Sequence, residues 1–418
     1  MQLLERRFTN LMKSLKLGKG TPIAIACSGG PDSMALALLA KAWVGSGKNK
    51  LVAVTVDHGW KKDSAKEAMQ VGQWLKKHGI RHVVLHGKGR KPSRNQHDVV
   101  RKIRYQILTH FCKQQGIAHL LVAHHLEDQA ETFLLRLAQG GSVDRLAAMP
   151  ASAQMFDITL VRPLLTLSKP DLLDYLKRRK QTFVDDPGNK DSTLDRVKLR
   201  KLRPALAEAG ISVERLAKTA QLMARARAHL EEETGTFLKT YCKIAPEGYA
   251  LFKHMPVSEE IALRVLSTLM MIVGGQDVKI RAAELERLHE GLLDSKFKGM
   301  TLGGCVFQRQ KEGIVVFREL RALAAERNIK QGEAVLWDSR FEVTLKAAPA
   351  KLKVGPLGQA GWAKLSAMQS IKNTCPNKNI LYSLPALRDA RGVIMAVPHF
   401  GFIADKSITC TVAFRQTT

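Results

Sequence analysis

Short apolar runs alternate with helical patterns from the N-terminus to about residue 165, and this alternation limits the fold more than any other feature. Strands joined by helices in this way form a parallel sheet with crossover helices. We therefore expect a doubly wound α/β domain, with its ligand site beyond the carboxyl ends of the strands. The expected strands are 23–27, 51–56, 82–85, 118–123 and 158–161, and the expected helices are 34–44, 64–77, 98–115 and 126–137.

The pattern changes after this first domain. A helix beginning at Ser168 still belongs to it as an appendage, because a serine followed by proline in the first turn is a typical helix start. Helical patterns dominate from 211 to 293, and the C-terminal segment is rich in β-forming residues, turn residues and proline. The expected domains are an α/β domain at 1–215, a mostly helical domain at 216–330 and a small α+β domain at 331–418.

The chain carries 66 Lys and Arg residues against 38 Asp and Glu residues, a net charge of +28. Self-repulsion of this size favours a polyanionic partner, and nucleic acid is the expected one. No apolar stretch reaches the roughly 18 to 20 residues that span a bilayer, and the N-terminus lacks the apolar core of a secretory signal. We therefore expect a cytoplasmic protein without a membrane partner.

Six cysteines are scattered singly, with no Cys-x-x-Cys pair and no close Cys/His cluster. This spacing argues against a zinc ribbon, an iron-sulfur site and a disulfide framework. We expect buried free thiols instead.

A glycine turn follows the first expected strand directly. Its sequence is Ser28-Gly29-Gly30-Pro31-Asp32-Ser33, and a helix starts behind it. A strand, a glycine turn and a helix N-terminus present backbone N–H groups and the positive end of the helix dipole to an anion. Ser28 and Ser33 add hydroxyl donors, whereas Asp32 would repel a bare phosphate and is expected to act through magnesium. A purely structural turn is the alternative at this point.

The turn resembles the pyrophosphate loop of the ATP pyrophosphatase (PP-loop) superfamily. Two further segments strengthen the likeness: Asp57-His58-Gly59 follows the second expected strand, and His124-His125-Leu126-Glu127-Asp128-Gln129-Ala130-Glu131-Thr132 follows the fourth. Together with 100–105, 162–165 and 384–389, they are similar to segments of the tRNA(Ile)-lysidine synthetase family.

This resemblance implies an enzyme that adenylates the wobble cytidine (position 34) of the isoleucine tRNA with a CAU anticodon and then attaches L-lysine to its C2. The implied cofactors are ATP and Mg²⁺, with L-lysine as co-substrate. The implied ATP-binding residues are Ser28, Gly29, Gly30, Pro31, Asp32, Ser33, Asp57 and His124, with Asp32 also as the magnesium ligand. The implied catalytic residues are Asp32, Asp128, Glu131 and Arg104.

Lysine must lose a proton before it can attack. Its ε-amine has a pKa of about 10.4, so deprotonation at neutral pH costs about 4.6 kcal/mol. On a helix beginning near Leu126, the spacing of His124, Asp128 and Glu131 places them roughly on one face. We assign Asp128 and Glu131 jointly to holding and deprotonating lysine. Without the resemblance, such early carboxylates would be expected only to complement the helix dipole.

Basic residues gather in two segments, 88–104 and 177–203. Such runs often form only a solvated surface, but beside a nucleotide site they favour contacts with RNA phosphates. With this family, the 1–215 domain is expected to be catalytic and the 216–330 domain to bind tRNA. The C-terminal domain has no catalytic constellation, so we expect it to bind tRNA far from the wobble base. The expected tRNA-binding residues are Arg178, Arg179, Arg196, Arg200 and Arg388.

Two other functions stay open at this point. Another PP-loop tRNA-modifying enzyme, such as one that thiolates a base, would generally need catalytic or cluster cysteines. A basic RNA-binding protein with a relic nucleotide fold would not turn ATP over to AMP. The sequence also leaves the oligomeric state open, with a homodimer as one option.

Overall fold

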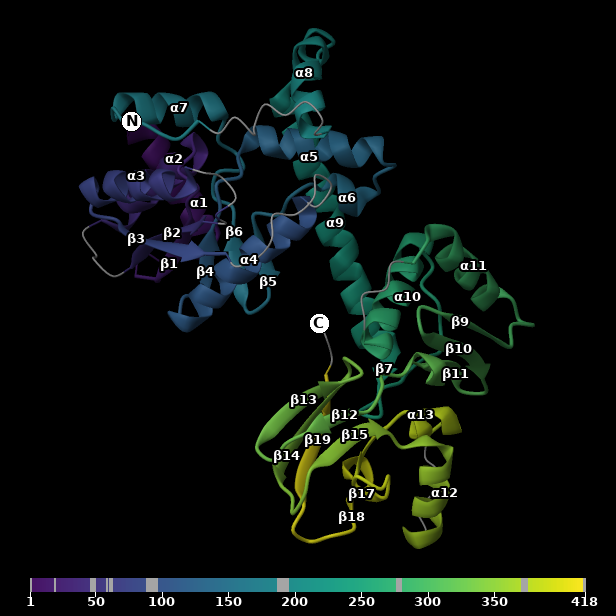
Figure 1. Cartoon of the computed structure of the whole chain (residues 1–418). Helices are drawn as coiled ribbons and strands as arrows, with labels where there is room; N and C mark the ends of the chain where they lie inside the picture. Colours follow the sequence, from purple (N-terminus) through teal and green to yellow (C-terminus); the bar gives the residue numbers. More distant parts are fainter. Residues whose placement is uncertain are drawn as a thin grey trace. The chain divides into compact units, whose positions relative to one another are not determined.

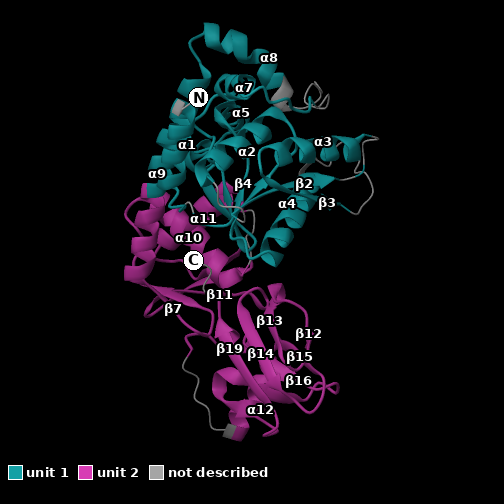
Figure 2. Cartoon of the chain, turned by 90° about the vertical axis from the view of Figure 1, so that its left-hand side faces the viewer, with its two compact units in different colours: residues 1–228 teal, residues 229–418 magenta. Residues whose placement is uncertain are grey.

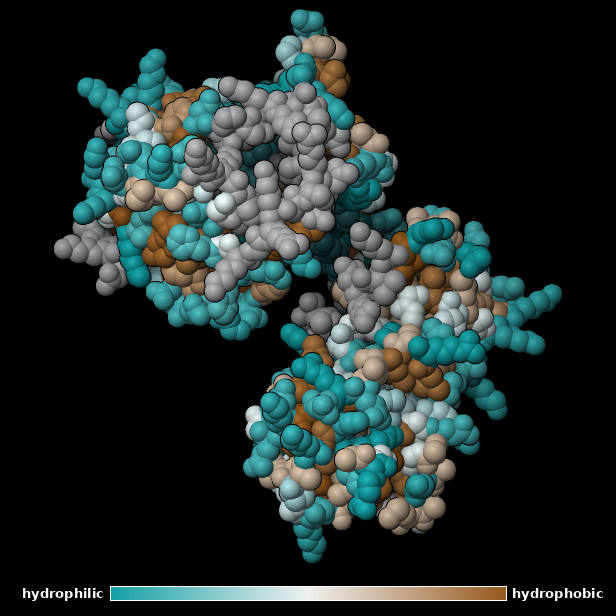
Figure 3. All heavy atoms as spheres, viewed as in Figure 1, coloured by the Kyte–Doolittle hydropathy of each residue, from teal (hydrophilic) through white to brown (hydrophobic). Residues whose placement is uncertain are grey.

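A computed structural model of the chain describes residues 2–18, 20–45, 50–57, 59, 63–87, 97–185, 195–275, 280–369 and 375–415. The chain divides into two compact units, Met1–Ala228 and His229–Thr418 (Figure 2). On the described part of the face seen in Figure 3, hydrophilic side chains (teal) surround smaller hydrophobic patches (brown). Among the described helices, none combines the length and the apolar character needed to cross a bilayer.

Unit 1 is built on a six-stranded sheet (Figure 1). Its strands are β1 (Ile23–Ala26), β2 (Leu51–Asp57), β3 (Arg81–His86), β4 (His119–Leu121), β5 (Ser152–Met155) and β6 (Ile158–Val161). They lie in the order β3-β2-β1-β4-β6-β5, and only β5 pairs antiparallel to its neighbour. The expected doubly wound α/β fold is confirmed. Strand β5 was not expected, because it is polar and contains no apolar run.

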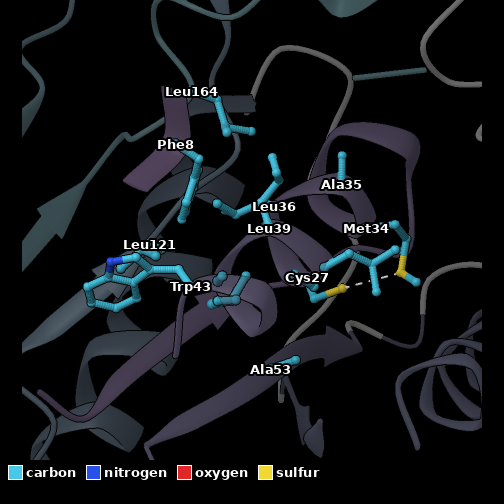
Figure 4. Close-up of a cluster of buried hydrophobic side chains, with 14 of the residues drawn as sticks. Phe8, Cys27, Met34, Ala35, Leu36, Leu39, Trp43, Ala53, Leu121 and Leu164 are labelled. Atoms are coloured by element: carbon cyan, nitrogen blue, oxygen red, sulfur yellow. Dashed lines mark hydrogen bonds between the residues drawn. The ribbon is translucent and has the colours of Figure 1, made fainter. Parts of the chain in front are cut away.

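Helices cover both faces of this sheet. Those packed on its faces are α1 (Gln2–Ser14), α2 (Pro31–Val44), α3 (Ser64–Lys77), α4 (His97–Gln114) and α7 (Lys169–Arg178). The remaining helices of unit 1 are α5 (Leu126–Ala138), α6 (Val143–Leu146), α8 (Asp195–Glu208) and the first part of α9 (Val213–Tyr241). Side chains alternate across a strand, so Ile23 and Ile25 of β1 pack with α1, α2, α3 and α7, whereas Ala24 packs with α4 on the opposite face. Figure 4 shows Phe8, Leu36 and Leu39 in the first of these clusters.

Helix α2 is apolar nearly all round, and residues 34–40 are buried without a break. It contacts α1 and α7 as well as β1 and β2. A helix enclosed on several sides needs no polar face. This packing holds the N-terminus of α2, and with it the glycine turn, in one position relative to the sheet.

Unit 2 contains antiparallel sheets with helices packed beside them. A five-stranded sheet in the order β7-β8-β11-β10-β9 shares a core with α10 and α11. Two further sheets have the orders β12-β15-β16-β17-β18 and β13-β14-β19. The elements are β7 (Cys242–Ile244), β8 (Ala250–Phe252), α10 (Glu259–Gly274), α11 (Ala282–Leu293), β9 (Gly299–Leu302), β10 (Cys305–Gln310), β11 (Gly313–Arg318), β12 (Arg327–Ile329), β13 (Glu333–Trp337), β14 (Phe341–Ala347), β15 (Leu352–Pro356), α12 (Gly358–Gln369), α13 (Lys378–Tyr382), β16 (Pro385–Arg388), β17 (Ile394–Val397), β18 (Phe402–Ile403) and β19 (Thr409–Phe414).

The division into three domains stays a prediction. Helix α9 continues through residue 215 without interruption. In unit 2, Val315 and Phe317 of β11 belong to the same core cluster as Trp337 and Val354. Segments on both sides of residue 330 therefore share one hydrophobic core.

Candidate active site

The glycine turn after β1 leads directly into α2. Gly29 has a φ of +83°, a left-handed conformation that residues with a side chain rarely adopt. A Cβ on Gly29 would lie 2.4 Å from Val71 Cγ2 and 3.2 Å from Val184 Cγ2. The backbone N–H of Val184 also donates to Gly29 O at 2.9 Å. Both the backbone angle and the close approach of neighbouring segments therefore require glycine at this position.

Ser33 shapes the turn from inside. Its Oγ accepts a hydrogen bond from Ser28 N at 3.2 Å and donates one to Gly30 O at 3.0 Å. Gly30 is the N-cap residue of α2, and Pro31 follows at the start of the helix. Because Gly30 has no side chain that could cap the helix, N–H groups of the first turn remain available to an anion.

Asp57 and His124 lie at the same edge of the sheet as the turn, because β1, β2 and β4 are parallel. Asp57 Oδ1 accepts a hydrogen bond from Gly59 N at 2.8 Å. His124 Nε2 lies 3.4 Å from Arg101 Nη2. The structure thus brings together the turn and two of the residues predicted to bind ATP, whereas His58 lies outside the described residues.

His125 is buried at the N-terminus of α5 and is surrounded by carboxylates. Its Nδ1 lies 2.9 Å from Glu127 Oε2, and its Nε2 lies 3.6 Å from both Asp32 Oδ2 and Asp128 Oδ2. Lys169 Nζ lies 3.5 Å from Asp32 Oδ2. His125 therefore connects the first turn of α2 with the first turn of α5.

The pKa values in this cluster follow from its charges. Burial lowers the pKa of His125, but Asp32, Glu127 and Asp128 outweigh burial and raise it to about 9. Burial raises the pKa of Asp32, yet His125 and Lys169 outweigh this effect and hold the pKa below its ordinary value. Glu127 also has a lowered pKa, because His125 and the Lys169 backbone N–H outweigh its burial. At neutral pH the cluster holds an imidazolium among carboxylates.

Glu131 lies about one turn further along α5, and only 2% of its surface is exposed. Arg200 of α8 donates from Nε to Glu131 Oε1 at 2.6 Å and from Nη2 to Glu131 Oε2 at 3.1 Å. Arg203 Nη1 lies 4.0 Å from Glu131 Oε1. A residue predicted to contact tRNA thus pairs with a residue predicted to be catalytic.

Comparison with known proteins matches the chain to one family over nearly its whole length. A family model described as a PP-loop domain matches residues 1–206, a range that includes every site residue named above. The tRNA(Ile)-lysidine synthase of Wolbachia pipientis wMel is 32% identical over 410 residues, covering 96% of this chain and 93% of that protein. This chain belongs to the tRNA(Ile)-lysidine synthase family.

Two further members of this family are similar over most of their length. The tRNA(Ile)-lysidine synthase of Orientia tsutsugamushi (strain Boryong) is 29% identical, covering 94% of this chain and 92% of that protein. The tRNA(Ile)-lysidine synthase of Ruegeria pomeroyi is 33% identical, covering 76% of this chain and 75% of that protein. The family likeness that the sequence motifs indicate is thereby confirmed.

Arg104, on α4, is the predicted active-site cation. Its Nε is buried and has no hydrogen-bond partner among the described residues. Its guanidinium carbon lies 5.6 Å from the centre of the Tyr105 ring. A buried N–H donor without a protein acceptor is chemically suited to a ligand oxygen, and the role of Arg104 stays a prediction.

The other predicted tRNA contacts in unit 1 are separate from the carboxylate cluster. Arg178 Nε pairs with Asp174 Oδ2 at 2.8 Å. Arg179 Nη2 donates to Glu5 Oε1 at 2.5 Å. The side chain of Arg196 lies outside the described residues. These three residues stay predicted tRNA contacts.

Arg388, the predicted tRNA contact in unit 2, makes contacts within its own unit. Its Nη2 donates to Leu357 O at 2.9 Å, and its Nη1 lies 3.7 Å from Glu326 Oε1. Burial lowers the pKa of Arg388. Part of its guanidinium is therefore already committed to holding β16 in place, and its role in tRNA binding stays a prediction.

No role was expected for His125, Glu127 or Lys169. Two adjacent histidines follow β4, and this pair was the available signal for His125. Lys169 carried no such signal, because it reaches Asp32 only through the packing of α7 beside α2. Long-range ion pairs of this kind cannot be read from local spacing.

A cavity of about 540 Å³ opens beside Glu131. Its wall includes the apolar side chains of Leu134 and Leu216, and its charged lining includes Glu131, Arg200 and Arg203. An apolar wall with a few charged groups suits a small amphipathic molecule. The cavity lies entirely within unit 1.

Proposed function

We propose that this chain ligates L-lysine to C2 of the wobble cytidine (position 34) in the isoleucine tRNA with a CAU anticodon, using ATP and giving lysidine, AMP and pyrophosphate. Likeness to tRNA(Ile)-lysidine synthases over nearly the whole chain carries this proposal. The net charge of +28 supports an RNA substrate. The turn before α2 supports the use of ATP.

In the first half-reaction, O2 of the cytosine attacks the α-phosphorus of ATP. The bond to the bridging oxygen breaks, pyrophosphate leaves and the base carries AMP. Backbone N–H groups of residues 28–33 are placed to bind the phosphates through the N-terminus of α2. The poor leaving group at C2 thereby becomes a phosphate ester.

Asp32 fits the role of magnesium ligand. Its Oδ1 is buried without a hydrogen-bond partner among the described residues, and its lowered pKa keeps it charged. Magnesium is usually held by one or two carboxylates and by substrate phosphates, and Asp32 offers one such carboxylate. A magnesium ion held by Asp32 would neutralise charge on the departing pyrophosphate.

In the second half-reaction, the ε-amine of lysine attacks C2 and AMP leaves. Asp128 and Glu131 hold the ammonium group and accept its proton before the attack. Arg104 supplies a positive charge beside the substrates. The apolar wall that includes Leu134 and Leu216 offers a surface for the aliphatic part of lysine.

Base thiolation is less well supported, because the two cysteines of unit 1 are poor nucleophiles. Cys27 and Cys112 are both buried. Burial raises the pKa of Cys27, and it raises the pKa of Cys112 to about 11. A thiol kept protonated in an apolar core is chemically inert.

Nucleoside mass spectrometry tests the proposed function directly. A tRNA with a CAU anticodon is incubated with the chain, ATP, magnesium and lysine, digested, and analysed for a cytidine that has gained lysine minus water. We expect this product only when ATP and lysine are both present. Release of AMP without the lysine adduct would leave ATP use intact but refute lysine as the nucleophile.

The assignment of Glu131 predicts different losses in the two half-reactions. Glu131→Gln should lower lysidine formation by about 10²- to 10⁴-fold, as expected for a general acid-base group, while pyrophosphate release falls much less. Equal losses of both steps in Glu131→Gln would place this residue with ATP or magnesium.

Asp32→Ala should instead abolish AMP formation and leave tRNA binding nearly intact.

The proposed substrate is a cytoplasmic RNA, so we place the reaction in the cytoplasm. We also keep the homodimer as the arrangement to test for the oligomeric state. Light scattering at working concentration distinguishes a dimer from a monomer of 46.3 kDa.

A further inference from the structure

Without substrates, the carboxylate of Glu131 is already paired with another side chain of the same protein. Arg200 uses two of its nitrogens to bind both oxygens of this carboxylate, at 2.6 Å and 3.1 Å. Such charge-assisted paired hydrogen bonds are among the stronger polar contacts in proteins. The 2% exposure of Glu131 leaves little room for a second cation at the same oxygens.

This contact conflicts with the role that the proposed function gives to Glu131. An ammonium group needs the same oxygens that the guanidinium of Arg200 holds. Both oxygens are bound by Arg200, so lysine can use Glu131 only after Arg200 has moved away. The cavity beside the pair provides space for such a movement.

RNA phosphates are a second class of anion that suits Arg200. Its side chain is 38% exposed and that of Arg203 is 36% exposed, whereas Glu131 is buried beneath them. Helix α8 also carries Lys198, Lys201 and Arg203, so this helix presents a basic surface. An RNA backbone brings a dense row of phosphates to such a surface and competes for exposed guanidinium groups.

We propose that Arg200 occupies the lysine-ammonium position in the free enzyme, and that an RNA phosphate draws it away from Glu131 when tRNA binds. Lysine then binds productively only after tRNA. This inference rests on the proposed function, since it requires both substrates to be those of a tRNA lysine ligase. Arg200 acts here as a positioning residue, because it controls access to a catalytic group.

Lysine titrations with and without tRNA test this order of binding. Calorimetry on the full chain, with a non-hydrolysable ATP analogue and magnesium, measures the lysine Kd before and after addition of a CAU-anticodon tRNA. We expect tRNA to tighten lysine binding by about 5- to 150-fold, the usual range of coupling between two sites. This wild-type comparison needs no variant to fold, and an equal Kd in both states would overturn the proposal.

Arg200→Gln removes the competing cation. Without tRNA, this variant should bind lysine at least about tenfold more tightly than the wild type, and tRNA should add little further. Lys13→Gln, an exposed change of equal charge on α1, should behave like the wild type. If Arg200 only orients Glu131, Arg200→Gln will weaken lysine binding in both states, and that result would refute the exchange.

These outcomes separate the inference from the proposed function. If the wild type forms the lysine adduct but its lysine Kd is the same with and without tRNA, only the proposed exchange at Arg200 is refuted. If no adduct forms under any condition, the proposed function fails first.

Discussion

At the scale of single residues, Gly29 and Gly30 are neighbours with different requirements. Gly29 has a φ of +83° and no room for a Cβ, whereas Gly30 has a φ of −68°. A Cβ on Gly30 would have Ser28 Oγ as its nearest neighbour at 3.6 Å, an ordinary contact. Backbone conformation and packing therefore require glycine at position 29 but not at position 30, where the proposed function gives glycine another purpose, access for a phosphate.

Gly29→Ala should destabilise unit 1 even without nucleotide. The strained φ and the clash with Val71 together should cost about 1 to 3 kcal/mol in the free energy of unfolding. Gly30→Ala is the matched control and should change ligand-free stability little, although it should weaken ATP binding. Urea unfolding and ATP titration of both variants measure these effects. Equal stability of the two variants would contradict the assigned geometry.

At the scale of elements, Glu127 joins the starts of two helices. Both of its oxygens accept from the backbone N–H of Lys169 at the N-terminus of α7, at 2.9 Å and 3.1 Å. The same carboxylate lies 2.9 Å from His125 Nδ1. A negative charge at a helix N-terminus is favourable, so this contact aligns α7 with α5 and places Lys169 beside Asp32.

The pKa of His125 predicts how the stability of this junction depends on pH. In the folded protein this pKa is about 9, above the ordinary value of about 6.5. The stabilisation that protonated His125 gives to the fold is therefore complete below about pH 6.5 and is lost as pH rises through 9. We expect the free energy of unfolding, measured by urea without magnesium and nucleotide, to fall by up to about 3 kcal/mol over this interval.

Histidine variants check this pH dependence. His125→Gln should remove the decline between pH 6.5 and 9, because no imidazolium is then lost. His110→Gln, an exposed change on α4, should retain it. A wild-type stability that stays constant over this interval would show that His125 is not held as a cation.

At the scale of the whole molecule, each unit depends on buried charges of its own. In unit 2, Asp338 accepts hydrogen bonds from Arg318 and from Arg340 Nε, the latter at 2.7 Å. All three residues are buried, and Arg340 is 0% exposed. Burial lowers the pKa of Arg340 to about 10 even though Asp338 opposes this effect. One carboxylate therefore compensates two buried guanidinium groups.

Asp338→Asn should destabilise unit 2 strongly. Removing one partner of a buried ion pair typically costs about 3 to 5 kcal/mol. Glu342→Gln, an exposed change on β14, should stay within about 0.5 kcal/mol. Urea unfolding of the full chain, followed by hydrogen exchange in residues 229–418, measures both. A loss below about 1 kcal/mol in Asp338→Asn would refute the role of this triad.

Binding of tRNA by the C-terminal region is a proposal that substitutions of exposed residues test better than truncation does. Ending the chain near Gln331 would open the core that Val315 and Phe317 share with Trp337. Lys346, Lys351 and Lys353 are exposed instead. Their replacement can remove charge without disturbing this core.

Replacing these three lysines by glutamine should weaken tRNA binding and flatten its salt dependence. The slope of log K against log salt should shrink by about 0.7 to 0.9 for each RNA phosphate that the protein no longer neutralises. ATP affinity should not change, because unit 1 is untouched. The melting temperature should not change either, because all three side chains are exposed. An unchanged slope with full tRNA affinity would show that this surface does not meet the RNA.

The sequence alone determined the α/β fold of unit 1, the position of the glycine turn and the sheet edge at which the candidate site lies. These features follow from local periodicity and from the rule that parallel strands end at one edge, so neighbouring residues suffice to define them. The family followed as well, because its motifs are contiguous segments.

Only the tertiary structure decided which charges meet. Arg200 reaches Glu131 across 69 positions of sequence, and Lys169 reaches Asp32 only because α7 packs beside α2. The same holds for the triad around Asp338 and for the carboxylates around His125. The spacing of residues along the sequence does not reveal which group a charged side chain will pair with, because pairing depends on how whole helices and sheets pack.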